Sequence, residues 1–286
     1  MEQIIVNGLV LSATYALVAL GITLIFSIMN LLNFAHGQML MIGGFVVYYV
    51  YYVWGLPFAA ALVAAAIVVG TIGVLFEVLF FRRVVKVATR EENSMLLAVG
   101  TALLLENVAL FAFGEKQRGV PPVIAGVYHV GNAYLPAGRL LVVAISFLLI
   151  VGLLLFVQYT RPGRAMRALA QDRQVTHLMG VDVERISAMG FGIGAALAGL
   201  AGGLLVTTQG VNAGVGTAIS TKAFIMIMIG GAGVVAGAIL GAVALGFAEA
   251  VGYALIPGST TYLLIFVGLI LFLILRPQGI MGKPQG

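Results

Sequence analysis

The sequence contains no cysteine, a single tryptophan and few charged residues, which make up only 9% of its 286 residues. A soluble domain carries about 25% charged residues, so this chain could not cover a globular surface with solvated groups. The lack of cysteine excludes a disulfide framework, cysteine zinc sites and thiol nucleophiles. Hydrophobic residues make up 62% of the chain, with a mean hydropathy of +1.13. These values exclude a water-soluble enzyme and indicate a membrane protein.

The few charges leave two long apolar stretches. Residues 3–76 contain no Asp, Glu, Lys or Arg, and residues 186–275 contain only Lys222 and Glu249. A membrane-spanning helix needs roughly 20 apolar residues, so the sequence predicts an all-α polytopic bundle of about eight to nine spans. Residues 1–286 then form a single transmembrane domain. The expected spans are 4–29, 35–54, 57–81, 94–113, 139–159, 187–207, 235–253 and 259–275, with a short or re-entrant segment near 219–231.

The basic residues concentrate in the expected loops 82–93 and 160–185, whereas the 114–138 loop has only Lys116 and Arg118. The positive-inside rule places the first two loops in the cytoplasm and the third outside. We therefore expect a multi-pass membrane protein with an external N-terminus and a cytoplasmic C-terminus. The charge pattern suits membrane topology and lipid contact better than a nucleic-acid-binding surface.

The 160–185 loop has the pattern of an amphipathic helix. Pro162 and Gly163 are expected to break the preceding span, after which a helix runs from Arg164 to about Met179. Gly180 is a suitable C-terminal cap. From the residues alone, this helix could lie on anionic lipid or dock into a groove on a cytoplasmic partner.

Polar groups inside a membrane are costly and often functional. Glu106 and Glu249 lie deep in expected spans, which leaves open an interhelical hydrogen bond or a place beside the transport path. Residues 33–37 suit either a turn at the membrane boundary or the cytoplasmic end of that path. Lys222 is expected near the outer boundary, where it could snorkel. The candidate pathway or gating residues are Asn33, His36, Gly37, Glu106 and Glu249.

The sequence gives no support for catalysis or cofactor binding. Residues 231–236 (GAGVVA) fit the G-x-G-x-x-G/A pattern of dinucleotide binding, but both flanks are expected membrane segments, where that motif does not function. The sequence has no H-E-x-x-H, no clustered metal-ligating set and no plausible Ser-His-Asp arrangement, so we expect no catalytic residues and no bound metal. No G-x-x-x-x-G-K-[ST] loop occurs, so the chain does not itself bind ATP through that motif. The chain has 38 glycines, and glycine and alanine residues recur four positions apart within the expected spans. Small residues at this spacing predict closely packed helices. Faces that slide, or that meet another subunit, remain the alternative.

Several segments resemble a known family. They are residues 7–45, with the Asn33–Gly37 box (NFAHG) as their most specific part, the loop 163–183, the glycine-rich stretch 223–249, and RPQGIMG near the end. Together they resemble LivH-type permeases of branched-chain amino-acid ABC importers over nearly the whole chain. Urea and short-amide permeases share much of this pattern.

The resemblance implies a permease subunit of the bacterial inner membrane for ATP-driven uptake of leucine, isoleucine and valine, with no cofactor of its own. The expected partners are a LivM-like second permease subunit, two cytoplasmic ATPases that bind ATP, and a periplasmic or lipid-anchored substrate-binding protein. Alternatives are the same importer for urea or another small polar solute, a stand-alone secondary transporter or channel, or a structural subunit. The residues expected to contact an ATPase are Gly163, Arg164, Ala165, Arg167, Ala168, Asp172 and Gly180.

Overall fold

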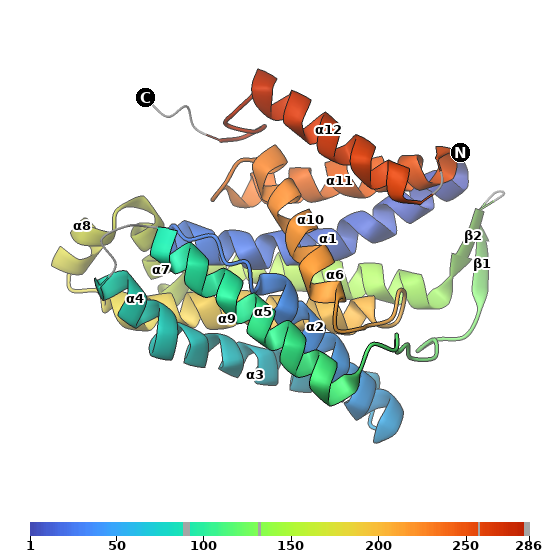
Figure 1. Cartoon of the computed structure of the whole chain (residues 1–286), viewed down its shortest axis with the longest axis horizontal. Helices are drawn as coiled ribbons and strands as arrows, with labels where there is room; N and C mark the ends of the chain where they lie inside the picture. The colour runs from blue at the N-terminus through green and yellow to red at the C-terminus, as the bar shows by residue number, and fades with distance from the viewer. Residues whose placement is uncertain (88–91, 131–132, 257, 283–286) are drawn as a thin grey trace.

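The computed structural model describes residues 1–87, 92–130, 133–256 and 258–282. It is a bundle of helices, most of which run along one long axis (Figure 1). The helices are α1 (Glu2–Met29), α2 (His36–Val47), the π-helical η1 (Tyr48–Val53), α3 (Phe58–Phe76), the π-helical η2 (Glu77–Phe81), α4 (Arg82–Val87), α5 (Glu92–Phe113), α6 (Ala137–Tyr159), α7 (Arg161–Gln171), α8 (Arg173–Leu178), α9 (Val183–Leu205), α10 (Val215–Gly230), α11 (Val235–Leu255) and α12 (Ser259–Leu275).

Each expected span coincides with a helix of the bundle. Among the described residues, 6 helices are long and apolar enough to cross a membrane, namely Glu2–Met29, Phe58–Val84, Asn93–Phe113, Ala137–Tyr159, Val183–Leu205 and Val235–Leu255. The expected second span, 35–54, is α2 continued by η1, and the short segment near 219–231 is α10, with 16 residues. The polytopic helical fold is therefore as expected.

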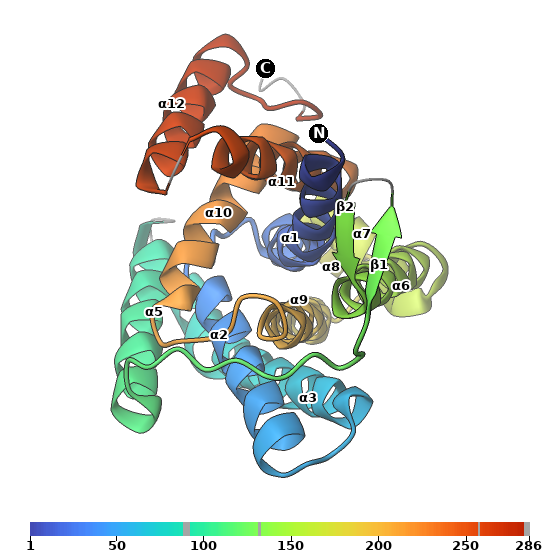
Figure 2. The same ribbon diagram turned by 90° about the vertical axis from the view of Figure 1, so that its right-hand side faces the viewer.

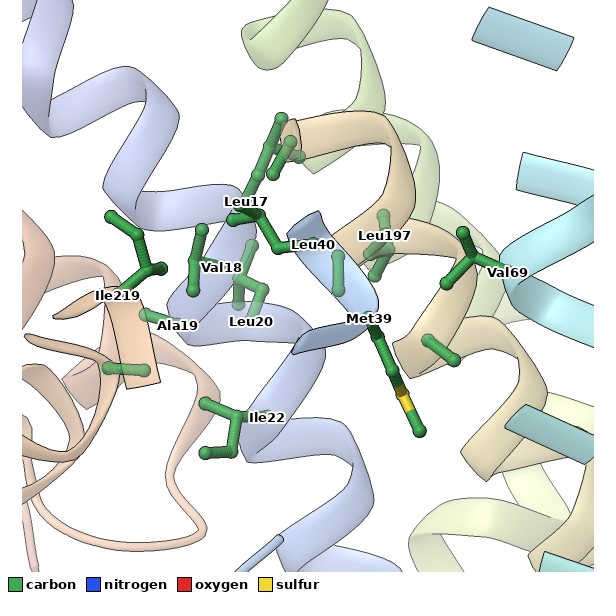
Figure 3. Packing of buried hydrophobic residues seen from close by; sticks show 14 of the residues in the cluster. Leu17, Val18, Ala19, Leu20, Ile22, Met39, Leu40, Val69, Leu197 and Ile219 are labelled. Atoms are coloured by element: carbon green, nitrogen blue, oxygen red, sulfur yellow. The ribbon is translucent and has the colours of Figure 1, made fainter. Parts of the chain in front are cut away.

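Helices α1 and α9 form the centre of the bundle, with α2, α10 and α11 around α1 (Figure 2). Residues 15–25 of α1 are buried without exception, so this helix, which is apolar on all sides, is covered by other helices of the bundle instead of lipid. Figure 3 shows Leu17, Val18 and Leu20 of α1 packed near Leu40 of α2 and Leu197 of α9. By contrast, α5, α6 and α12 turn large apolar side chains outward, which suits contact with lipid or another membrane subunit.

Glycines bring neighbouring backbones into contact at two interfaces. A Cβ atom at Gly43 of α2 would overlap the backbone of Gly199 in α9, and one at Gly237 of α11 would overlap Gly230 of α10. Close backbone approach of this kind holds helices together in lipid, where apolar burial supplies little attraction between them. The packing interpretation of the glycine spacing is confirmed at these positions. Gly233 differs, because it lies in the turn before α11 with a φ of 78°.

The two ends of the bundle differ in their elements. Helices α4, α7 and α8 lie at one end, while the N-terminus and a β-hairpin lie at the other (Figure 1). Arg82 fastens the first end, with Nη2 at 2.9 Å from Glu77 Oε2 and Nη1 at 3.1 Å from Glu184 Oε2. The two expected arginine-rich loops thus share one end, opposite the 114–138 segment.

Two expected loops contain more regular structure than the sequence indicated. The 114–138 segment includes an antiparallel hairpin of β1 (Val127–Val130) and β2 (Ala133–Pro136), with Val127 paired to Pro136. Within the described residues, the hairpin is the exception to an otherwise helical structure. The expected 82–93 loop begins as helix α4 and ends where α5 starts, at Glu92, while its residues 88–91 lie outside the described part of the chain.

Candidate functional site

Helix α2 begins deep inside the bundle. After α1 ends at Met29, Asn30 adopts a left-handed conformation with φ 52°, and the chain returns alongside α1. His36 Nε2 then lies 3.2 Å from the carbonyl oxygen of Val18, which at 1.5 Å per residue is about 16 Å from the end of α1. The box at residues 33–37 is therefore a break within the bundle, beside the middle of α1.

Hydrogen bonds within the box fix this break. Asn33 Oδ1 accepts a hydrogen bond of 3.0 Å from the backbone N–H of Ala35. His36 Nε2 faces a carbonyl oxygen, so that nitrogen carries the proton and Nδ1 is left as an acceptor. Both side chains are fully buried, and among the described residues His36 Nδ1 and Asn33 Nδ2 have no hydrogen-bond partner.

The N-terminus of α10 meets the N-terminus of α2 at the box. The backbone N–H of Gly37 donates to Ser220 Oγ at 3.0 Å, and Ser220 Oγ donates to the carbonyl oxygen of Phe34 at 2.9 Å. Gly37 packs directly on the carbonyl oxygen of Gly216. Two helix N-termini with partial positive charge therefore converge inside the bundle.

Glu106 of α5 lies at this junction. Its Oε2 accepts hydrogen bonds from Thr217 Oγ1 at 2.6 Å and from Gln38 Nε2 at 3.1 Å. A carboxylate beside the first turn of α10 is favourable because of the helix dipole. Glu106 and Thr217 also line a groove of about 510 Å³ with Phe34 and Phe224, so Glu106 both links helices and faces open space.

A second buried cluster joins α1, α10 and α11. Lys222 Nζ lies 2.8 Å from Glu249 Oε1 and donates to Glu249 Oε2 at 3.1 Å and to Tyr15 Oη at 2.7 Å. Tyr15 Oη donates to Glu249 Oε2 at 2.6 Å. The Lys222 and Glu249 side chains are 9% and 1% exposed. The expectation that Lys222 snorkels at the boundary is wrong, since it is paired beside Tyr15 near the middle of α1.

The sequence did carry a signal for this pair. Lys222 and Glu249 are the only two charged residues in residues 186–275, and they have opposite sign. Two charges that cannot reach water inside a membrane satisfy each other. Tyr15 gave no comparable signal, because a tyrosine in an apolar helix is unremarkable without its partners in space.

The 160–185 segment folds as two helices, so the single helix expected from Arg164 to Met179 is wrong. The preceding span does end here, but the break falls at Thr160, and Pro162 lies in the first turn of α7, where proline is favourable. The backbone N–H of Gly163 donates to the N-cap Thr160 Oγ1 at 3.1 Å. Asp172, with φ −155°, ends α7 and caps α8 through Oδ1, which accepts from the N–H of Gln174 at 2.8 Å. Gly180, with φ 82°, follows α8 as the expected cap.

Helix α7 holds the segment against the bundle while α8 projects from it. Met166 and Leu169 are buried, and Gly163 packs against the backbone of α6, so these residues anchor α7. Leu178 and Met179 are 83% and 79% exposed. Of the residues expected to contact an ATPase, the exposed ones are Arg164, Arg167, Ala168, Asp172 and Gly180, and Ala165 is partly buried.

Comparisons with known proteins find one family over nearly the whole chain. Residues 4–275 match the family model described as "Branched-chain amino acid transport system / permease component". The chain is 34% identical to the high-affinity branched-chain amino acid transport system permease protein BraD of Pseudomonas aeruginosa, over 99% of this chain and 96% of the relative. It is 33% identical to LivH of Escherichia coli, over 98% of this chain and 94% of LivH. It is 27% identical to LivM of the same organism, over 96% of this chain and 70% of LivM. No solved structure matches the chain.

Proposed function

The chain belongs to the family of permease components of branched-chain amino acid transport systems, and we propose that it is the transmembrane subunit of an ATP-driven, binding-protein-dependent importer of leucine, isoleucine and valine. The observation that carries this proposal is the match to BraD and LivH over nearly the full length of both proteins. The multi-pass helical bundle provides the membrane domain that such a subunit needs.

The other parts of the importer are separate chains. The similarity to LivM supports pairing with a second, homologous permease subunit. Two cytoplasmic ATPases would hydrolyse ATP, and a periplasmic or lipid-anchored binding protein would deliver the substrate. The end with α4, α7 and α8 would face the cytoplasm because it carries the arginine-rich segments. The N-terminus would then be external, the C-terminus cytoplasmic, and the chain would cross the inner membrane nine times, with α10 completing a crossing that begins as loop.

Helices α7 and α8 would couple this subunit to an ATPase. ATP-driven closure of an ATPase pair has to move the spans mechanically, which requires a stiff element on a short connection. Only Thr160 separates α6 from α7, and Met166 and Leu169 seat α7 on the bundle. The exposed Leu178 and Met179 offer an apolar contact to the partner, with Arg164 and Arg167 available for acidic groups.

The junction of α2 and α10 would form the gate. Discontinuous helices whose N-termini meet inside a bundle place dipoles at the substrate path in many transporters. Asn33, His36 and Gly37 hold this break together, and Glu106 links it to the groove. We expect the substrate to pass close to Glu106.

The test is uptake by the complete importer, reconstituted in vesicles with both permease subunits, the ATPases and the binding protein. Radiolabelled leucine should accumulate only with ATP on the ATPase side, and proton or sodium ionophores should leave uptake unchanged. Accumulation of urea in place of leucine would assign the machine to the alternative cargo. Uptake without ATP that collapses with the ionophores would identify a secondary transporter.

A further inference from the structure

A cavity of about 440 Å³ extends from the hairpin end of the bundle to the Lys222–Glu249 pair. Asn7 and Arg139 line its outer part, where Arg139 Nη1 donates to Asn7 Oδ1 at 2.9 Å. Its inner part is lined by Lys222 and Glu249 together with Tyr253 and Tyr262. Small-molecule sites have volumes of about 300–1,000 Å³, so this cavity is large enough for an amino acid.

The charges at the inner end of the cavity are difficult to explain by stability alone. A buried ion pair is often no more stable than well-packed apolar residues of similar volume. Lys222 and Glu249 are nevertheless placed inside the bundle with side chains 9% and 1% exposed, and both contribute to the lining of the cavity. Ionisable groups within a membrane bundle that face a cavity mark ligand or ion sites by default.

The pair retains capacity to bind a ligand. Glu249 Oε1 contacts Lys222 Nζ at 2.8 Å, but among the described residues it receives no well-aligned hydrogen bond. An ammonium group could donate to this oxygen. On the cationic side, Lys222 Nζ lies 5.0 Å from the centre of the Tyr262 ring and 5.2 Å from that of Tyr15. These rings hold the lysine in place without neutralising it.

We propose that this cavity is a binding site for the zwitterionic head of an apolar amino acid, with Glu249 binding its ammonium group and Lys222 its carboxylate. The inference rests on the proposed import function and adds a site within this subunit. A neutral pair of opposite charges complements a neutral zwitterion, because both new contacts are charge-assisted hydrogen bonds. Arg139 at the outer part of the cavity attracts the carboxylate on entry. Val10, Leu11, Ala250 and Ala254 supply apolar walls for the side chain.

This arrangement predicts which ligands the cavity prefers. A ligand that lacks one of its two charges leaves Lys222 or Glu249 without its new partner, and hydrogen bonds to charged groups are lost at a penalty of about 10- to 100-fold in affinity. Leucine should therefore bind more tightly than 4-methylpentanoate, which lacks the ammonium group, or 3-methylbutylamine, which lacks the carboxylate. Urea, which has neither charge, should not compete.

The experiment measures displacement of radiolabelled leucine from the purified, assembled importer in lipid nanodiscs, without the binding protein. The wild type should prefer leucine to both analogues by about 10-fold or more. In Glu249→Gln the preference over 4-methylpentanoate should disappear, and in Lys222→Gln the preference over 3-methylbutylamine should disappear. Glu77→Gln is the control, because it removes a partner from a different ion pair, with Arg82, at the end of the bundle away from the hairpin, and it should keep the wild-type order.

The double variant Lys222→Gln/Glu249→Gln is the control for misfolding, since it removes both charges of the pair and leaves neither one buried without its partner. It should assemble and bind all three compounds without preference. An unchanged order of affinities in the double variant, or a wild type that shows no preference for leucine, overturns the proposal. ATP-driven leucine uptake by the wild-type importer is measured in parallel, so failure of the import function is recognised separately from failure of this site.

Discussion

Gly37 tests whether the junction of α2 and α10 holds the bundle together. A Cβ atom at Gly37 would overlap the carbonyl oxygen of Gly216 and lie 2.5 Å from Ser220 Oγ and 2.7 Å from the backbone nitrogen of Ser220. Two of these three atoms belong to the backbone of α10 and cannot rotate away. The change Gly37→Ala therefore has to push α10 away from α2.

The expected loss has two parts. Overpacking of a filled interior costs about 1–3 kcal/mol, and separation of the helices stretches the hydrogen bond from the N–H of Gly37 to Ser220 Oγ, now 3.0 Å, which contributes about 1 kcal/mol. We expect Gly37→Ala to destabilise the bundle by roughly 2–4 kcal/mol. Gly100 in α5 is the matched control, since nothing lies within 4 Å of a Cβ placed there. Gly100→Ala should be neutral or stabilise by up to about 1 kcal/mol through helix propensity.

The assay is thermal unfolding of green-fluorescent-protein fusions in detergent, followed by size-exclusion chromatography. Gly37→Ala should lower the melting temperature by several degrees, whereas Gly100→Ala should leave it unchanged or raise it. Equal melting temperatures for the two variants would refute the reasoning, because the contact of Gly37 with α10 would then carry no stability.

Three further results are expected. Leu178→Asp should abolish co-purification of the ATPases, because it places a charge on the exposed apolar tip of α8. The control Tyr134→Asp, on the hairpin at the other end of the bundle, should retain the ATPases. Equal retention of the ATPases by both variants would contradict the coupling role. His36→Ala should destabilise the fold by about 2–4 kcal/mol through the cavity it leaves. His36→Phe should recover most of the lost stability by refilling the space. A stable His36→Ala variant would show that packing at the box is unimportant. On the cysteine-free background, an impermeant thiol reagent applied to intact cells should label Gln117→Cys but not Gln174→Cys, and the reverse pattern would invert the topology.

The sequence predicted the helices well because lipid imposes a simple rule on them. A span has to be apolar over its whole length, so hydropathy marks α1, α6 and α11 without any knowledge of their packing. The same rule hides where a helix stops inside the bundle. The break between the expected spans 4–29 and 35–54 was predicted, but only the contact of 3.2 Å between His36 Nε2 and the carbonyl oxygen of Val18 places the start of α2 beside the middle of α1.

The site was harder to predict, since its members are distant in the sequence. Lys222 and Glu249 are 27 residues apart, and Tyr15 is 207 residues from Lys222. Periodicity within one helix carries no information on which face meets which neighbour. In the arginine-rich loop, the sequence predicted the cap at Gly180, whereas the break at Asp172 depends on a side chain that can either continue a helix or cap the next one.

Helix α10 connects the two buried clusters. Thr217 and Ser220 bind the α2 junction and Glu106, and Lys222, two residues after Ser220, binds Glu249. Because residues 217–222, about one and a half turns of α10, carry all of these contacts, a displacement of α10 that opens the junction also shifts the ammonium group of Lys222 within the cavity. Ligand binding at the pair and opening at the junction should therefore be energetically linked. A double-mutant cycle of Thr217→Val and Glu249→Gln on leucine affinity measures this link, and strictly additive effects would show that α10 transmits nothing between the two clusters.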